Sequence, residues 1–445
     1  MLALSVAMPA FAQTMDDTLA KSYMTNPTLS SERAKLRATD EGVPQALSGW
    51  RPTVSLSYDG GRGQFYSNSS TTATRTTTRT TRSGTVTITQ NLYKGGRTVA
   101  ATRQAENQVL GERARLLSTE QQVMLQAATA YMDVVRDQAV LDLNINNEHV
   151  LERQLEATRD RFQVGEVTRT DVAQAESRLS GAISDRIAAA GNLLRSQANY
   201  RNVVGDLPGK LKTSPPLGDL PASEQETITL ARDQSPDVIA ARFDERAAQD
   251  QIDVVAGQFL PTLDLQGTLQ RNDNTSFSGS ETKEAGVDAI FKLPLYQAGL
   301  VSSQVRAAKE TLSQRRKDLD RVVRAAVQSA TQAWELLQTA RSQLRSFTDE
   351  VRAAEIALEG VRQEAQVGSR TVLDTLNAEQ ELLNARVNLV RAQHDEVVGS
   401  FTLRSAVGTL TVDKLALKVD RYDAENHYKS VRGRWLDFDT GVGDQ

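Results

Sequence analysis

The chain has 445 residues, a length that would ordinarily fold as two or three compact domains. Its composition argues against compact domains, because aromatic residues make up only 5% and hydrophobic residues 39%, and a thick core needs large side chains to fill it. The net charge of -4 provides no basic face for nucleic acid, and the lack of cysteine excludes disulfides, thiolate chemistry, cysteine-ligated metals and a lipid-bearing cysteine.

The first residues predict a signal peptide. An apolar run over residues 2–11 ends in Ala10-Phe11-Ala12, which has the form of a signal-peptidase site. We therefore expect residues 1–12 to be a signal peptide and the exported chain to begin at Gln13. No Lys or Arg precedes Lys21, so the basic start of a signal peptide is missing. A truncated start is favoured over the alternative that this run is not a signal peptide.

Short helices are predicted before each strand region, within residues 13–49 and 229–258. Each helical stretch is interrupted at one X-Pro step, Asn26-Pro27 and Ser235-Pro236. Asn26 can cap the helix that Pro27 starts, because proline suits the first helical position.

Each helical stretch leads through a Pro-Thr pair into alternating sequence. After Pro52-Thr53 and Pro261-Thr262, apolar residues recur at every second position, which predicts strands with one apolar face. The apolar positions are Val54, Leu56, Tyr58, Val86 and Ile88, and then Leu263, Leu265, Leu269, Val287, Ala289, Phe291, Leu293 and Leu295.

Polar stretches separate these strands. Residues 67–82 are almost wholly Ser, Thr and Arg, and residues 272–284 are rich in Asn, Ser, Gly and Glu, so both predict long solvated hairpin loops. We therefore expect one hairpin within residues 50–96, one within residues 259–299, and four strands in the chain.

Two proline-free reaches predict very long helices, because proline would break them. We expect helices of ~100 Å over residues 97–164 and 300–367, each followed by a shorter helix that folds back, within segments 97–205 and 300–408. Apolar residues recur every seven positions and the stripe shifts once by four, which indicates coiled coils with a local change of supercoil. The stripe is Val109, Leu116, Val123, Ala130, Val134, Leu141, Leu155 and Phe162, interrupted by Glu148 between Leu141 and Leu155, with counterparts Leu312, Leu319, Ala326, Ala333, Leu337, Leu344, Val351, Leu358 and Ala365.

Two further segments connect and end the chain. Residues 206–228 contain four prolines and predict an extended connector. Residues 409–445 have no counterpart elsewhere in the chain, and we expect this C-terminal tail to pack outside the helices.

An internal duplication organises all of these elements. The turn sequence QVGEVTRTDV at residues 163–172 is echoed by QVGSRTV at residues 366–372, and superposing Gly165 on Gly368 gives an offset of 203 residues. The same offset places Asp171 on Asp374 and Gly205 on Gly408, and many other pairs coincide. The chain therefore contains two copies of one helix–hairpin–helix–helix unit.

Four amphipathic strands in an exported chain suggest a membrane β-structure. An open four-stranded sheet has two edges that hydrocarbon cannot satisfy, so the sheet must close with other copies of itself. Aromatic residues near the strand ends suit the interfacial girdles of such barrels, and this role is favoured over simple packing at a strand–helix junction. They are Trp50, Tyr58, Phe65, Tyr66, Tyr93, Phe259, Phe291 and Tyr296.

The chain resembles the TolC-like outer-membrane channel proteins of type I secretion and efflux. The duplicated element order carries the resemblance, with LYKGG at 92–96, LYQAG at 295–299 and the two turn sequences. The resemblance implies a mainly α fold with a β-barrel part: a homotrimer in the outer membrane, with a twelve-stranded barrel continued across the periplasm by an α-helical barrel. It also implies a periplasmic adaptor, an inner-membrane ABC transporter or efflux pump, contact with outer-membrane lipid, and a polypeptide in transit.

The resemblance also implies roles at the paired turns, where family members close their tube. Thr170 and Asp171 correspond to residues that bond across to the other helix pair, and Arg370 corresponds to one partner. Ala365 stands where the family usually has a tyrosine, so a second link is missing. Asp374 matches the first of two aspartates that ring the lumen constriction, and Asn377 replaces the second, which halves the expected ring charge.

Helix capping is the alternative role for the same aspartates. Thr168 with Asp171, and Thr371 with Asp374, have capping-box spacing. Both roles remain open for Asp171, and the lumen ring is favoured for Asp374 because a threefold axis would gather like charges. Arg370 alone would be a solvated surface charge.

Three functions are compared. The leading hypothesis is a passive exit duct for type I protein secretion; the alternatives are the outer-membrane part of a drug efflux pump and a periplasmic coiled-coil scaffold. An enzyme is the weakest option, because no nucleophile motif, phosphate loop or metal-ligand spacing appears, and no cofactor is expected. We expect His149, His394 and His427 to be solvated helix-surface residues.

Overall fold

The computed structural model describes residues 13–69 and 72–435, so the predicted signal peptide lies outside the described residues. The chain divides into two compact units. Unit 1 comprises the described residues up to Ala34 with Ala114–Ile239 and Arg321–Asp423. Unit 2 comprises Lys35–Arg113, Ala240–Asp320 and the described residues from Ala424.

Short helices precede each hairpin, and both interruptions lie at the predicted prolines. Asn26 Oδ1 accepts from the backbone N–H of Thr28 at 2.9 Å, as expected of a cap, and its Nδ2 donates to the carbonyl of Val203 at 3.0 Å. The first set is α1 (Met15–Thr25), α2 (Pro27–Asp40), α3 (Gly42–Leu47) and η1 (Ser48–Trp50); the second is α6 (Glu224–Gln234), α7 (Pro236–Ala256) and η2 (Gly257–Phe259).

The connector is shorter than predicted. Helix α6 already begins at Glu224, within the expected connector 206–228, because Ser223 caps it by accepting from the N–H of Glu226 at 3.2 Å. The preceding chain is held in unit 1 by the buried side chain of Tyr131, which donates to the carbonyl of Lys212 at 2.7 Å. Burial raises the pKa of Tyr131 to about 12, which keeps its hydroxyl protonated as a donor.

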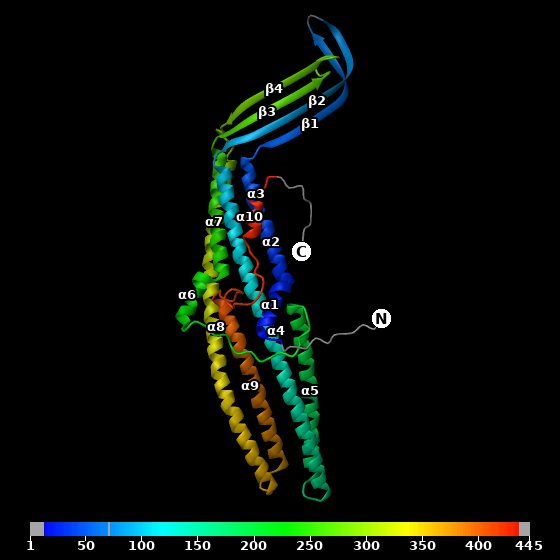
Figure 1. The fold of residues 1–445 in the computed structure, drawn as a ribbon, viewed down its shortest axis with the longest axis vertical. Coiled ribbons are helices and arrows are strands. Elements are labelled where there is room, and N and C mark those ends of the chain that lie inside the picture. Colours follow the sequence, from blue (N-terminus) through cyan, green and yellow to red (C-terminus); the bar gives the residue numbers. More distant parts are fainter. Residues whose placement is uncertain (1–12, 70–71, 436–445) are drawn as a thin grey trace. The chain divides into compact units, whose positions relative to one another are not determined.

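One antiparallel sheet in unit 2 contains the four strands in the order β1-β2-β3-β4 (Figure 1). Their bounds are β1 (Thr53–Ser69), β2 (Thr72–Lys94), β3 (Thr262–Asp273) and β4 (Glu281–Lys292). The two predicted hairpins are therefore neighbours in one sheet, because β2 also pairs with β3, for example at Val86 and Leu269.

Three strand boundaries differ from the prediction. β1 and β2 run through the expected loop 67–82, because its many threonines are β-branched and favour extended backbone. The loop expected at 272–284 is confined to residues 274–280. Leu293 and Leu295 lie beyond β4, which ends at Lys292 just before Pro294, a residue that cannot donate to the strand ladder.

The register places the apolar residues on one face of the sheet. Leu56 pairs with Val86, Val86 with Leu269, and Leu269 with Ala285. Paired residues point to the same side and alternate residues return to it, so Tyr58, Val287 and their neighbours share this apolar face. The opposite, polar face carries Ser55, Ser57, Thr85, Thr87, Gln266, Gln270, Glu284 and Asp288. The apolar face is largely exposed in the single chain, with Leu56 76% and Val287 73% exposed.

Three of the predicted girdle aromatics do not share one face of the sheet: the register places Phe65 on the face opposite to Tyr58 and Tyr66. Phe65 pairs with Thr77 on the polar face, and the guanidinium carbon of Arg79 lies 3.8 Å from its ring centre. Tyr58 and Tyr66 lie on the apolar face.

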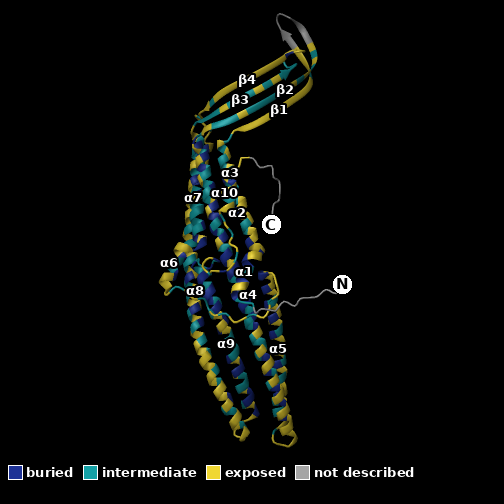
Figure 2. Ribbon diagram, in the orientation of Figure 1, coloured by how far each residue is buried: buried dark blue, intermediate teal, exposed yellow. Residues whose placement is uncertain are grey.

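Four helices carry the coiled-coil pattern, and their bounds agree with the prediction to within one residue at each end. They are α4 (Arg97–Gln163), α5 (Arg169–Val204), α8 (Leu300–Gln366) and α9 (Val372–Ala406). A seam of mostly small residues, all buried, follows α5 in steps of seven: Ala175, Ala182, Ala189, Ser196 and Val203. The 203-residue offset places Ala385, Ala392 and Gly399 of α9 in an equivalent buried seam. Small side chains let helices approach closely, so these helices pack without a thick core (Figure 2).

The described part of the tail contacts helices. In unit 1, the N–H of Val412 donates to buried Glu120 at 2.8 Å, and the N–H of Tyr422 donates to the hydroxyl of Tyr23 at 3.1 Å. In unit 2, α10 (Asn426–Val431) brings His427 to the buried carboxylate of Asp40, with 3.1 Å between Nδ1 and Oδ2. His427 is therefore not the solvated surface residue that the sequence predicted.

Candidate functional site

The two repeat turns lie in unit 1 and share one backbone design. Gly165 and Gly368 have φ of 79° and 80°, which favours glycine over any residue with a Cβ. The N–H of Gly165 donates to Phe162 at 3.0 Å, and the N–H of Glu166 donates to Arg161 at 2.9 Å. Residues 364–369 repeat both bonds at 3.2 and 3.0 Å. These are the paired bonds of a Schellman motif, so each long helix is terminated in the same way.

The next helix begins, in each repeat, with a capping box. Thr168 donates its N–H to Asp171 Oδ2 at 2.8 Å and accepts from the N–H of Asp171 at 3.3 Å. Thr371 and Asp374 make the same exchange at 2.9 and 3.2 Å. The capping interpretation of both aspartates is therefore confirmed as a structural role. Hydrogen bonds from Thr168 lower the pKa of Asp171, and those from Thr371 lower the pKa of Asp374.

Equivalent ion pairs join the long and short helices of each repeat. Arg159 of α4 lies 2.7 Å from Glu176 of α5. Arg362 of α8 pairs with Glu379 of α9, and the 203-residue offset relates the two pairs. These four residues are not among the predicted site residues, although the 203-residue offset relates both members of each pair.

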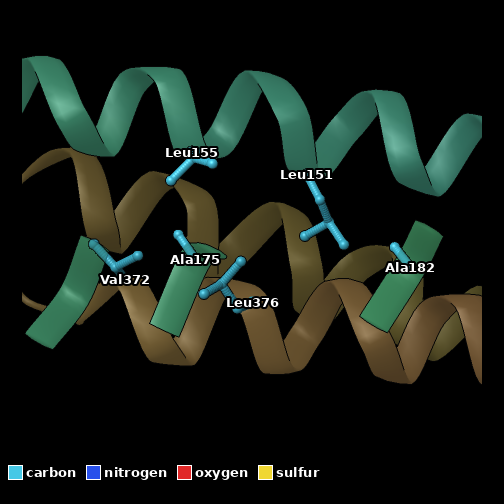
Figure 3. Close-up of a cluster of buried hydrophobic side chains, with 6 residues drawn as sticks. All are labelled: Leu151, Leu155, Ala175, Ala182, Val372 and Leu376. Atoms are coloured by element: carbon cyan, nitrogen blue, oxygen red, sulfur yellow. The ribbon is translucent and has the colours of Figure 1, made fainter. Parts of the chain in front are cut away.

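Near the two turns, an apolar cluster and a hydrogen bond join the first repeat to the second. The cluster, shown in Figure 3, brings α4 and α5 against the first turns of α9; its members are Leu151, Leu155, Ala175, Ala182, Val372 and Leu376. Beside it, Arg178 of α5 donates to Asn377 Oδ1 of α9 at 2.8 Å. Asn377, predicted at the lumen constriction, is thus a partner of the first repeat within the same chain.

The predicted gate residues occupy the two turns. Thr170 is exposed and Asp171 is half-buried in the first turn of α5. Arg370 donates from Nε to Glu364 at 2.8 Å, within its own turn, and this hydrogen bond raises the pKa of Arg370. The single chain therefore brings Arg370 to Glu364 rather than to Thr170 or Asp171.

A second polar cluster, missed by the sequence interpretation, lies farther along the helices of unit 1. His394 of α9 is only 8% exposed and lies 3.0 Å from Asp133 and 2.8 Å from Asp395. Burial acts to raise the pKa of Asp133, but the hydrogen bond with His394 and the charge of Arg136 outweigh burial and lower it. A cavity of about 500 Å³ adjoins this cluster.

This environment corrects the expectation for His394, whereas His149 is exposed as predicted. The helical period of the sequence could not predict this contact, because His394 lies in α9 and its partner Asp133 lies in the other repeat.

Within residues 13–69 and 72–435, no group of three or more His, Cys, Asp or Glu side chains is arranged to hold a metal ion. Across the same residues, every helix is too short or too polar to cross a membrane.

The capping boxes predict a pH dependence of local stability. A carboxyl group whose pKa is lowered in the folded state stabilises that state. This stabilisation is complete above the pKa of the unfolded state, about 3.9 for aspartate, and is lost as pH falls through the folded pKa. We expect hydrogen-exchange protection at the starts of α5 and α9 to be constant near neutral pH and to fall below about pH 4.

The substitution Thr371→Val tests whether the capping box is the source of this protection. It should speed exchange at the start of α9 by roughly 2- to 30-fold, the usual range for a lost cap, and leave the start of α5 unchanged as an internal control. Equal protection at the start of α9 in the variant and the parent would contradict the capping role.

The comparisons with known proteins agree with this architecture. A family model described as outer membrane efflux protein matches residues 20–206 and 227–409. The outer membrane efflux protein BepC of Brucella suis is 36% identical over 98% of this chain and 94% of its own length. The outer membrane protein TolC of Escherichia coli is 28% identical, covering 91% of this chain and 84% of TolC. The alkaline protease secretion protein AprF of Pseudomonas aeruginosa is 24% identical over 68% of this chain and 65% of AprF.

A solved structure has the same fold. The Campylobacter jejuni CmeC outer membrane channel superposes with a TM-score of 0.80 at 16% identity, covering 94% of this chain and 89% of that one. The chain belongs to the outer membrane efflux protein family, and it is a TolC-like protein of the outer membrane with a helical extension into the periplasm.

Proposed function

We propose that three copies of this chain close their sheets into one twelve-stranded barrel. The observation that carries the proposal is the sheet, in which β1 and β4 each pair on one side only. Hydrocarbon cannot satisfy the free backbone groups of such edges, so β4 of one copy would pair with β1 of the next. The apolar face would then contact lipid, and the polar face would line an aqueous lumen.

The helices of the three copies would continue this lumen as a tube through the periplasm. Resemblance to the family supports a periplasmic adaptor that docks on the repeat turns and links the tube to an inner-membrane transporter. The duct would conduct its substrate passively, without a catalytic step of its own.

Type I protein secretion is the first candidate process. The similarity to AprF supports it, since the name of that relative describes protease secretion. The absence of a lipid-bearing cysteine also favours the secretion branch of the family.

Small-molecule efflux is the second candidate process. BepC, a relative that matches nearly the whole chain, is described as an efflux protein. Deletion of the gene in its host separates the candidates: loss of a polypeptide from the medium would support secretion, and accumulation of a dye or drug in the cells would support efflux.

A periplasmic scaffold is the third candidate, but it would not need a sheet with an apolar face. Single-channel recording from the purified full chain in a planar bilayer tests the duct. We expect discrete conductance steps, and an assembly that inserts without conducting would contradict the proposal.

The gate proposal concerns the carboxylate of Asp171 and the exposed guanidinium of Arg370. The capping bonds of Asp171 go to Oδ2, so Oδ1 remains geometrically suited to accept from an arginine of a neighbouring copy. Arg370 lies in the corresponding turn of the second repeat and already binds one carboxylate, that of Glu364. In the trimer, Arg370 would tie adjacent turns together and keep the duct closed.

Arg370→Ser should therefore raise single-channel conductance severalfold, because the substitution removes a charge-assisted tie between copies. Arg352→Ser is the matched control, since it removes an exposed ion pair to Asp349 within α8 and should leave conductance unchanged. Equal conductance in Arg370→Ser and the parent would count against the gate.

The lumen ring is a separate proposal for Asp374. Three copies around a threefold axis would bring three of these carboxylates together and attract multivalent cations. Asp374→Ala should abolish block of the conductance by such cations. Thr371→Val, which removes the cap but keeps the carboxylate, should preserve the block; an unaltered block in Asp374→Ala would remove the assignment.

A further inference from the structure

The apolar face of the sheet ends in a row of four cations, one from each strand. Arg62 of β1 pairs with Thr80, two residues from Arg82 of β2. Arg271 of β3 pairs directly with Lys283 of β4, and Arg82 pairs with Asp273, two residues from Arg271. Because paired and alternate residues share a side, all four cations extend from the face that carries Leu56, Leu269 and Val287.

Charge on this face is confined to that end. Between the apolar positions and the row, the face carries Gly60 and Gly84 and no charged residue. Asp273 and Glu281 lie at the row on this same face, whereas Asp59, Arg79, Lys94, Asp264, Glu284, Asp288 and Lys292 belong to the polar face. The row is therefore a boundary between an apolar band and a charged rim.

The band has the length of a membrane crossing. From Leu263 to Arg271 the strand advances about 26 Å, at ~3.3 Å per residue. This length is close to that of a tilted transmembrane strand, which contains ~9–11 residues. The row lies at the hairpin end, opposite the end where β2 leads into α4. With the helices in the periplasm, the row meets the outer leaflet at headgroup depth.

The row has an excess of positive charge. Arg271 lies 3.4 Å from Asp273 and 3.2 Å from Glu281, and Lys283 lies 2.9 Å from Glu281. Two carboxylates therefore face four cations. Arg271 and Lys283 are direct cross-strand partners, and both contact the carboxylate of Glu281, which offsets the repulsion between their like charges.

Arg62 and Arg82 are exposed diagonal neighbours on adjacent strands. Such neighbours lie about 7–8 Å apart, so two guanidinium groups can converge on one phosphate and bind it through several N–H donors. Tyr58 lies next along the same face with its ring exposed, as in amphipathic residues at a membrane boundary.

We propose that this row, Arg62, Arg82, Arg271 and Lys283, binds the phosphate groups of phosphorylated lipid headgroups in the outer leaflet. The inference rests on the proposed function only in requiring the apolar face to contact lipid. It adds a ligand, a phosphorylated lipid, and a residue set that the duct itself does not use. The bound lipid would fix the depth of the barrel in the membrane.

The test measures binding of bisphosphorylated lipid A to the purified full chain in detergent by native mass spectrometry. The double variant Arg62→Gln/Arg82→Gln should bind about 25-fold more weakly, from about 5-fold for each basic residue near a charged membrane surface. Arg62→Lys/Arg82→Lys should retain most of the affinity. Lys94→Gln/Lys292→Gln, which removes two cations from the polar face, should bind like the parent.

Three outcomes would overturn the inference: unchanged affinity in Arg62→Gln/Arg82→Gln, equal binding of a dephosphorylated lipid A, and displacement of the lipid by an equal concentration of inorganic phosphate. Bilayer conductance of the same samples separates this result from the proposed function. A parent chain that conducts but binds no phosphorylated lipid contradicts only the lipid site, whereas one that inserts without conducting contradicts the duct.

Discussion

The unpaired edges of the four-stranded sheet are the constraint on which the functional interpretation depends. β1 and β4 each have one partner within the chain, and a backbone N–H or C=O without a partner costs several kcal/mol in hydrocarbon. The sheet also exposes large apolar side chains on one face and polar side chains on the other, an arrangement that suits lipid outside and water inside. A single copy satisfies neither condition, and the proposed assembly of three copies would satisfy both.

Because of the internal duplication, the long and short helices of the two repeats begin and end in equivalent ways. Each long helix ends at a positive-φ glycine, and each short helix starts with a Thr–Asp capping box. The seams of small residues in α5 and α9 permit close approach where large side chains would hold helices apart. The repeats differ in their charged residues at the turns, because Arg370 pairs with Glu364 while Arg161 pairs with Glu166. The proposed gating would depend on this difference in charge, since the two turns share the same backbone hydrogen bonds and capping boxes.

Local signals were enough to predict most of the fold. Proline positions, the heptad period and turn glycines act within a few residues, and they predict the ends of α4, α5, α8 and α9 to within one residue. The polarity of the threonine-rich stretch 67–82 predicts a loop, whereas its β-branched side chains favour the strand that the structure shows. The burial of His394 beside Asp133 and of Asp40 beside His427 depends on contacts between distant segments, which periodicity does not encode. The apolar face was predicted, whereas its basic rim needed the register of all four strands.

The number of chains in the purified complex tests the central claim most directly. Native mass spectrometry of the full chain, released from a detergent micelle, should give the mass of three chains and no stable single-chain species. Closing twelve strands would leave no free edge, so the trimer should persist after the detergent is stripped. A single chain that stays in solution without detergent would contradict the account, because its sheet edges and apolar face would then need no partner.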